Sequence, residues 1–227
     1  MIVAQRKPFE EIKKSLAPYE NIVVAGCGTC VAVCLAGGKK EVGLLASQLR
    51  MSFGLDKKNV KVSEVTLERQ CDREFLETVK NEVEQAEAVL SMACGAGIQF
   101  LAEAYPQRPV YPGVNTTFIG VAEAAGLWTE RCRACGECLL AETGGICPRT
   151  ICSKGLNNGP CGGMMEGKCE VDPERSCAWV LIYDRLSQED RLAAMEAVRQ
   201  PTDYTRQTQP GKVTHAAYLR RYHADSK

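Results

Sequence analysis

Residues 132–177 read CRACGECLLAETGGICPRTICSKGLNNGPCGGMMEGKCEVDPERSC, and this stretch decides what kind of fold the chain can form. It contains eight of the thirteen cysteines of the chain: Cys132, Cys135, Cys138, Cys147, Cys152, Cys161, Cys169 and Cys177. It is rich in glycine and has few large apolar residues, so it cannot build a hydrophobic core of its own. We therefore predict a cysteine-rich module whose folding energy comes from bound metal. Eight thiols are enough for two four-cysteine sites.

The spacing of these cysteines suits iron–sulfur clusters. A C-x-x-C pair can hold one metal centre from a tight turn, and a [4Fe–4S] cluster takes four thiolates. Cys132, Cys135 and Cys138 form a C-x-x-C-x-x-C run like that of bacterial ferredoxins, and Cys147 is followed by proline, as the fourth ferredoxin cysteine is. Structural zinc, which also takes four cysteines, is the alternative. The spacing does not determine which four thiols share a site.

Composition narrows the classes of function. The 227 residues include 28 basic and 28 acidic side chains, a balance that argues against nucleic acid or an anionic membrane as the main partner. The sequence has no apolar run of the roughly 18 to 20 residues that a membrane span needs, and its N-terminus lacks the features of a signal peptide. We therefore expect a cytoplasmic protein. Thiols stay reduced in the cytosol, so thirteen cysteines indicate metal binding there rather than disulfides.

Strands and helices are predicted to alternate before the cysteine-rich module, which indicates an α/β fold with a small parallel sheet. Apolar or alternating runs predict strands at 21–26, 59–67, 88–93 and around 117–121. Helical periodicity predicts helices at 8–18, 40–52, 72–87 (with Asp72 as its cap), 97–104 and, as one helix or two, 178–198. We divide the chain into an α/β domain with an N-terminal cluster site (1–125), a cysteine-rich metal-binding module (126–180) and a C-terminal helix with a tail (181–227). The tail either binds a partner or is disordered.

A second group of cysteines lies in the α/β domain. Cys27, Cys30 and Cys34 follow the predicted strand 21–26, and Cys94 follows the predicted strand 88–93. Ligands of parallel sheets gather at the carboxyl ends of the strands, so we expect these four thiols to meet there and form a third site. A thioredoxin-like redox pair of Cys27 and Cys30 is the alternative. This count leaves Cys71 over, as an inert or weakly reactive thiol.

Signals for catalysis by the chain itself are missing. There is no phosphate-binding Walker loop, and the GAGI sequence at 95–98 is too short for a dinucleotide fingerprint. The two histidines, His215 and His223, lie in the tail outside any motif. We predict no catalytic residue.

Two motifs resemble a known family. GICPRTICSKGLNNGPCGG at 145–163, followed by GKCEV at 167–171 and CAWVLIYDRL at 177–186, closely resembles the cysteine-rich methylenetetrahydrofolate reductase C-terminal family. GCGTCVAVCLAGGKKEV at 26–42 is similar to the other half of the MetV-type small subunits of that enzyme. The resemblance implies a separate TIM-barrel subunit, carrying FMN or FAD, that reduces 5,10-methylenetetrahydrofolate to 5-methyltetrahydrofolate.

The resemblance also implies a role for this chain. It would bind the flavin subunit and supply electrons through two or three [4Fe–4S] clusters, with zinc in place of one as an alternative. The implied ligands are the twelve cysteines named above, namely Cys27, Cys30, Cys34, Cys94 and the eight from Cys132 to Cys177. Further electron-donor subunits are a second class of partner. Two other functions stay open: a zinc-held scaffold that assembles the flavoprotein without carrying electrons, and a thiol or iron–sulfur sensor.

Overall fold

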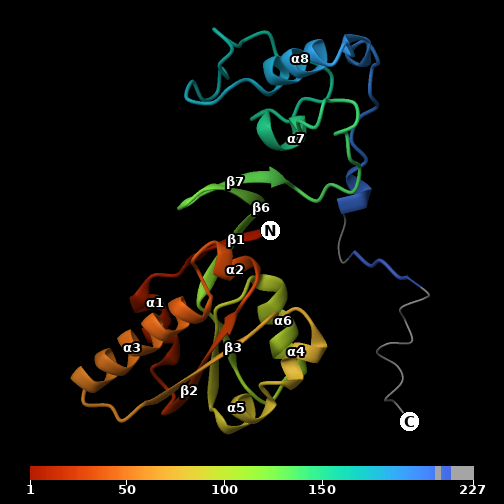
Figure 1. The fold of residues 1–227 in the computed structure, drawn as a ribbon. Coiled ribbons are helices and arrows are strands. Elements are labelled where there is room, and N and C mark those ends of the chain that lie inside the picture. Colours follow the sequence, from red (N-terminus) through yellow and green to blue (C-terminus); the bar gives the residue numbers. More distant parts are fainter. Residues whose placement is uncertain (208–210, 216–227) are drawn as a thin grey trace. The chain divides into compact units, whose positions relative to one another are not determined.

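The computed structural model describes residues 1–207 and 211–215, and these residues form two compact units. The first unit comprises residues 1–131, and the second begins at Cys132 (Figure 1). Residues 208–210 and 216–227 lie outside the described residues, and so does much of the predicted tail with His223. Among the described helices, none combines the length and the apolar character needed to cross a membrane.

The first unit is built on a four-stranded parallel sheet, which confirms the predicted α/β class. Its strands, in spatial order, are β3 (Lys61–Leu67), β2 (Asn21–Cys27), β4 (Ala88–Ser91) and β5 (Val110–Pro112). Strand β2 lies inside the sheet, and every residue of it after Asn21 is buried. A strand covered on both faces needs a continuous apolar run, and residues 22–25 supply one.

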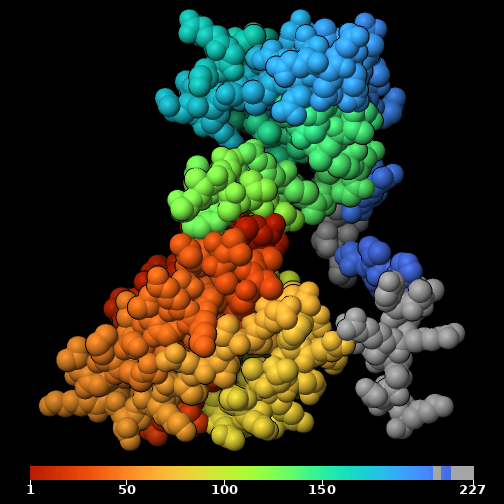
Figure 2. All heavy atoms as spheres, viewed as in Figure 1, coloured from red at the N-terminus to blue at the C-terminus, as the bar shows by residue number. Residues whose placement is uncertain are grey.

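Helices cover both faces of this sheet (Figure 1). On one face lie α1 (Phe9–Leu16) and α3 (Lys39–Leu55), and on the other lie α4 (Arg73–Glu77), α5 (Lys80–Gln85) and α6 (Gly95–Ala104). Side chains alternate along β2, so Ile22 and Val24 pack into one core with α1 and α3, while Val23 and Ala25 pack into the other. In Figure 2 the orange atoms of α3 form the outer surface of the helix layer that contains α1 and α3.

A second, three-stranded sheet in the first unit was not predicted. It contains β1 (Ile2–Arg6), β6 (Val114–Ala124) and β7 (Leu127–Cys132), in that order. The strand expected around 117–121 is part of β6, but it pairs antiparallel with β1, through Ile2 and Ile119 among others, instead of joining the parallel sheet. Most residues of β6 are exposed or half-buried, so it lacks the apolar run of a strand that is covered on both faces.

The helix predicted over 72–87 is divided into α4 and α5. Asp72 is the N-cap of α4 as predicted, and its carboxylate accepts a hydrogen bond from the backbone N–H of Glu74 at 3.3 Å. The division falls at Thr78 and Val79, which are both β-branched. The Thr78 hydroxyl also donates to the carbonyl of Phe75 at 2.7 Å, a local bond that competes with helix continuation.

The second unit consists mostly of loops around short elements. These are α7 (Pro148–Ile151), α8 (Ala178–Gln188) and two 3-10 turns at Leu192–Met195 and Tyr204–Gln207. Trp179, Ile182 and Leu186 of α8 form a small apolar core, against which Ile146 and Leu156 pack. Most of this core comes from residues that follow the cysteine-rich stretch. For this reason the prediction that 132–177 has no core of its own did not include the core around α8.

Candidate metal centres

The carboxyl ends of three parallel strands meet at one edge of the first sheet. Register pairs Cys27, the last residue of β2, with Leu67 at the end of β3, and Ala25 of β2 with Ser91 at the end of β4. Cys94 follows β4 closely and is the N-cap of α6. The predicted ligands Cys27 and Cys94 therefore leave neighbouring strands at the same edge.

The other two predicted ligands of this site belong to the short helix α2 (Cys30–Val33). Cys30 opens the helix and is half-buried, whereas Cys34 is its C-cap and is buried. The backbone N–H of Ala4 donates to the Cys34 sulfur at 3.4 Å, and the Cys34 thiol is 3.6 Å from the carbonyl oxygens of Ala4 and Val31. The Cys34 sulfur therefore contacts backbone groups of β1 and α2.

A further thiol, Cys71, reaches this edge from the end of β3. Burial raises the pKa of the Cys71 thiol, and the negative charges of Cys27 and Cys94 raise it further. The residue before it, Gln70, is hydrogen-bonded to the carbonyls of Ala25 and Gly26, so Cys71 follows a residue that is fixed at this edge. The spacing of the cysteines gave Cys71 no ligand role, although it follows β3 (which ends at Leu67) just as Cys94 follows β4 (which ends at Ser91).

In the second unit, four of the predicted ligands line one pocket. They are Cys152, Cys161, Cys169 and Cys177, and the charged side chains of Lys154 and Glu170 line the pocket with them. A set of four thiols from one module is the donor set of both a [4Fe–4S] cluster and a structural zinc site. The residues present thus fit a four-cysteine metal site, as the sequence predicts. They also single out one set of four cysteines among the sets that the spacing left open.

A small hairpin brings two of these cysteines together. Lys168 bridges Ser176, the Cys169 N–H donates to the Arg175 carbonyl at 2.9 Å, and the Cys177 N–H donates to the Gly167 carbonyl at 2.8 Å. Because side chains alternate across such a ladder, Cys169 and Cys177 project from one face and Lys168 and Ser176 from the other. Gly167, at φ +77°, makes the tight turn that starts the hairpin.

Hydrogen bonds favour the thiolate form of one cysteine of this pocket, Cys169. Backbone hydrogen bonds at Val171 and Asp172 and the Ser153 hydroxyl lower the pKa of the Cys169 thiol, with the bond at Val171 contributing most. Cys177 is the N-cap of α8. Lys154 forms an ion pair with Glu170, and the Cys161 thiol donates to Glu170 at 3.5 Å. Metals bind the thiolate and not the thiol, so this environment suits a ligand set.

The remaining four cysteines of the module are grouped less closely. Arg149 of α7, nearly buried, donates to the Cys135 sulfur at 3.1 Å and to the Glu137 carbonyl at 2.9 Å. Burial raises the pKa of the Cys135 thiol, but a backbone hydrogen bond at Glu137 and the Arg149 cation outweigh it and lower the pKa. Cys147 is the N-cap of α7, so Arg149 connects its helix to the Cys135 loop. Cys132 and Cys138 are exposed.

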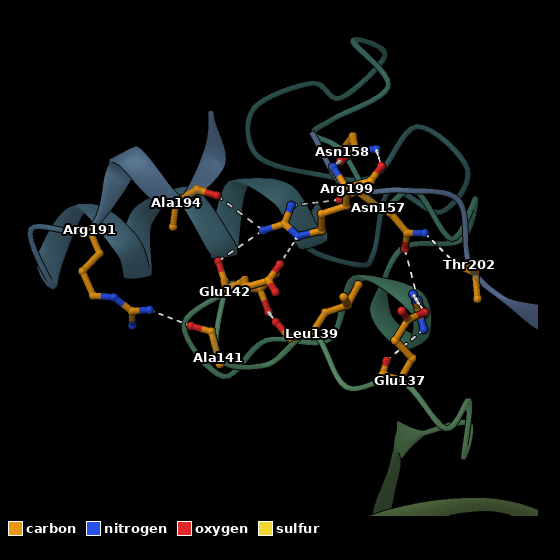
Figure 3. Close-up of polar contacts among 12 residues, drawn as sticks. Glu137, Leu139, Ala141, Glu142, Asn157, Asn158, Arg191, Ala194, Arg199 and Thr202 are labelled. Carbon is orange, nitrogen blue, oxygen red and sulfur yellow. Dashed lines mark hydrogen bonds and ion pairs between the residues drawn. The ribbon is translucent and has the colours of Figure 1, made fainter. Parts of the chain in front are cut away.

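A polar network anchors the loop that carries the pocket (Figure 3). The Arg199 guanidinium donates to the Glu142 carboxylate at 2.6 Å and to the Asn157 carbonyl at 3.1 Å, and the Asn157 side chain donates to Thr202 at 2.8 Å. The Trp179 indole N–H donates to the Leu156 carbonyl at 3.1 Å. The loop between Cys152 and Cys161 is thus fixed to α8 and to the segment after it, which holds its cysteines near the hairpin.

Metal-binding geometry itself is not formed in the described residues. Across 1–207 and 211–215, no three or more His, Cys, Asp or Glu side chains are arranged so that they could hold a metal ion. The structure does bring thiols together in two places, at the sheet edge and in the pocket. Metal binding by the twelve predicted cysteines stays a prediction.

Part of the chain matches a family of known proteins. A family model described as methylene-tetrahydrofolate reductase C terminal matches residues 111–205. This segment contains all eight cysteines of 132–177 and confirms the family that the motif at 145–163 resembles. The match does not extend to the first 110 residues. No curated protein matches the chain.

Proposed function

From the match of residues 111–205 to the methylene-tetrahydrofolate reductase C-terminal family, we propose that this chain is the electron-transfer and docking subunit of a methylenetetrahydrofolate reductase. A separate flavin-containing subunit reduces 5,10-methylenetetrahydrofolate to 5-methyltetrahydrofolate, and this chain delivers the electrons. The observation that carries the proposal is the pocket lined by Cys152, Cys161, Cys169 and Cys177, which lies inside the matched segment.

The residues of this pocket have distinct roles in the proposal. The four thiolates hold a [4Fe–4S] cluster, which supplies one-electron transfer when bound. The backbone bonds that lower the pKa of Cys169 favour its thiolate, the form that binds metal. Lys154, a cation beside Cys161 and Glu170, offsets part of the negative charge that four thiolates bring to the site.

Docking draws on apolar side chains beside the same pocket. Met165 and Val171 are more than half exposed on the hairpin, and Met164 is 40% exposed in the pocket wall. Methionine adapts its shape to a partner surface, and apolar contact drives association. A zero net charge leaves no long-range repulsion against a flavoprotein of either sign.

The test is quantification of iron, acid-labile sulfide and zinc in anaerobically purified chain, together with electron paramagnetic resonance of the reduced protein. We expect iron and sulfide in equal amounts, about four of each for every cluster, and a cluster signal after reduction. The reduced chain should also reduce the flavin of its partner subunit. A colourless protein that holds zinc without sulfide would overturn the proposal and favour the scaffold function.

A matched pair of variants assigns the pocket. Cys169→Ser should remove about four iron and four sulfide per chain, because one ligand of the set is lost. Ser176→Ala, on the same hairpin but on its opposite face, should leave both amounts unchanged. Equal iron in the two variants would exclude Cys169 from the ligand set.

A further inference from the structure

Cys34 is held in place by several contacts that already engage its sulfur. Its sulfur lies among the backbone groups of Ala4 and Val31 in the core below β1. After it, Leu35 takes φ +57°, and the N–H groups of Ala36 and Gly37 both donate to the Val31 carbonyl. Cys34 could turn its sulfur to a metal only if these contacts were broken.

Gly37 fixes the same turn to the sheet. Its carbonyl accepts the backbone N–H of Cys27 at 2.9 Å, and a Cβ at this glycine would lie 1.9 Å from the Met92 carbonyl oxygen. So close an approach to β-sheet backbone leaves the segment no room to rotate. The orientation of Cys34 is therefore set by the fold of the unit and not by a free loop.

The buried side chain of Gln70 positions the next residue, Cys71, at the sheet edge. The Gln70 amide nitrogen donates to the carbonyls of Ala25 at 2.8 Å and Gly26 at 3.1 Å, and its amide oxygen accepts the Ser91 hydroxyl at 2.6 Å. Gln70 is completely buried. One side chain thus ties the segment after β3 to the ends of both β2 and β4, and the next residue is Cys71.

The same polar contacts continue toward Cys94 and Cys27. The Ser91 hydroxyl also accepts the N–H of Ala93, the residue before Cys94, at 3.3 Å. The Cys27 thiol lies 3.8 Å from the Glu68 carbonyl, in the segment that carries Cys71. These contacts place the residues next to Cys71, Cys94 and Cys27 at one edge of the sheet.

We propose that the metal site of the first unit is formed by Cys27, Cys30, Cys71 and Cys94, with Cys71 in the position that the spacing of the sequence gives to Cys34. Three of these thiols come from the ends of three adjacent parallel strands, and Cys30 comes from the helix that follows the middle one. Four thiolates from one sheet edge suit a [4Fe–4S] cluster. The inference rests on the proposed function for its cluster, but the choice of thiol is separate from it.

Metal analysis of two variants in the full chain tests this choice. Cys71→Ala should lose about four iron and four sulfide relative to the unmodified chain, the content of one cluster. Cys34→Ala, which keeps an apolar side chain in the core, should retain them. Loss in Cys34→Ala with retention in Cys71→Ala overturns the assignment, and so does retention in both. If the unmodified chain holds only zinc, the proposed function fails, and the loss of zinc from each variant then decides between the two thiols.

Alkylation provides a readout that does not depend on variants that fold. Cys71 is an exposed residue, so as a free thiol it should be accessible to iodoacetamide in the purified protein. As a ligand it should react only after chelation has removed the metal, and peptide mass spectrometry can follow it directly. Reaction of Cys71 at the same rate before and after chelation would overturn the assignment. If both variants lose metal, protection of Cys71 in the purified protein supports the assignment.

Discussion

The two units bring their cysteines together by different physical means. In the first unit, the backbone register of a buried sheet positions the thiols, with Cys27 and Cys94 at strand ends that are fixed by large apolar cores. In the second, loops carry the thiols, and a small core around α8, a hairpin and buried arginines hold the loops. A site built on a core should exist before metal binds, whereas a site built on loops should depend on the metal for its own stability. The following changes test that difference.

Metal removal should separate the two units most strongly. After chelation, the amides of the hairpin at 165–177 should lose their protection from hydrogen exchange, since bound metal supplies about 10 kcal/mol or more to small metal-held modules. The amides of β2 should keep theirs, because its residues pack in both cores of the sheet. Mass spectrometry of exchanged peptides measures both in one sample. Equal loss in β2 would show that the first unit also needs metal to fold.

Truncation of a core side chain should have the opposite effect and destabilise the first unit. Leu45→Ala on α3 removes a completely buried side chain and should lower the free energy of unfolding of the first unit by about 2 to 5 kcal/mol. Leu44→Ala changes the neighbouring residue, which is 56% exposed, and should cost at most about 0.5 kcal/mol. Urea titration followed by hydrogen exchange of β2 peptides compares them. A similar cost for both variants would contradict the arrangement of this layer.

The Gln70 side chain tests how a core controls a metal site. Gln70→Ala leaves the Ser91 hydroxyl and the carbonyls of Ala25 and Gly26 without this partner in a buried place, and should cost about 1 to 3 kcal/mol. It should also make Cys71 react faster with iodoacetamide in the metal-loaded protein. Gln99→Ala, which removes an exposed side chain that bonds within α6, is the control. Unchanged Cys71 reactivity in Gln70→Ala would show that other contacts position this thiol.

The sequence predicts the secondary structure of the first unit well where a segment has a single clear hydrophobic pattern. The apolar run at 21–26 gives β2, and the alternation of strands and helices gives the parallel sheet. The antiparallel sheet could not be predicted, because β1 and β6 contain few buried residues. The two strands are also far apart in the sequence, since Ile2 pairs with Ile119. No local pattern encodes such a pairing.

The choice of thiols needs information that spacing does not contain. Cys30 and Cys34 would share one face of a regular helix, but α2 ends after four residues and the chain turns at Leu35 with a positive φ. The turn sends Cys34 toward β1, while the buried contacts of Gln70 bring in Cys71 from 44 residues beyond Cys27. In the second unit, the pairing of Cys152 and Cys161 with the hairpin depends on loop closure through residues such as Asn157 and Arg199.

The smallest expected effect is a pH dependence confined to the first unit. Glu87 accepts the backbone N–H groups of Glu20 at 2.7 Å and Asn21 at 3.1 Å, and these bonds hold the pKa of its carboxyl below the usual range. The folded state therefore binds the proton less readily than the unfolded state. The resulting stability is present above the unfolded pKa and is lost as the pH falls through the folded pKa.

Glu87→Gln should thus lower the urea midpoint of the first unit slightly at pH 7 and leave it unchanged at a pH below the folded pKa, where the carboxyl of the unmodified chain is protonated. The effect is small because the carboxyl is exposed to solvent. Glu103→Gln, at an exposed position on α6, should shift the midpoint at neither pH. A difference between Glu87→Gln and the unmodified chain that persists in acid would mean that the side chain stabilises β2 by its shape and not by its charge. The second unit should show no response to Glu87→Gln at either pH, because this carboxylate binds Glu20 and Asn21, which both belong to the first unit.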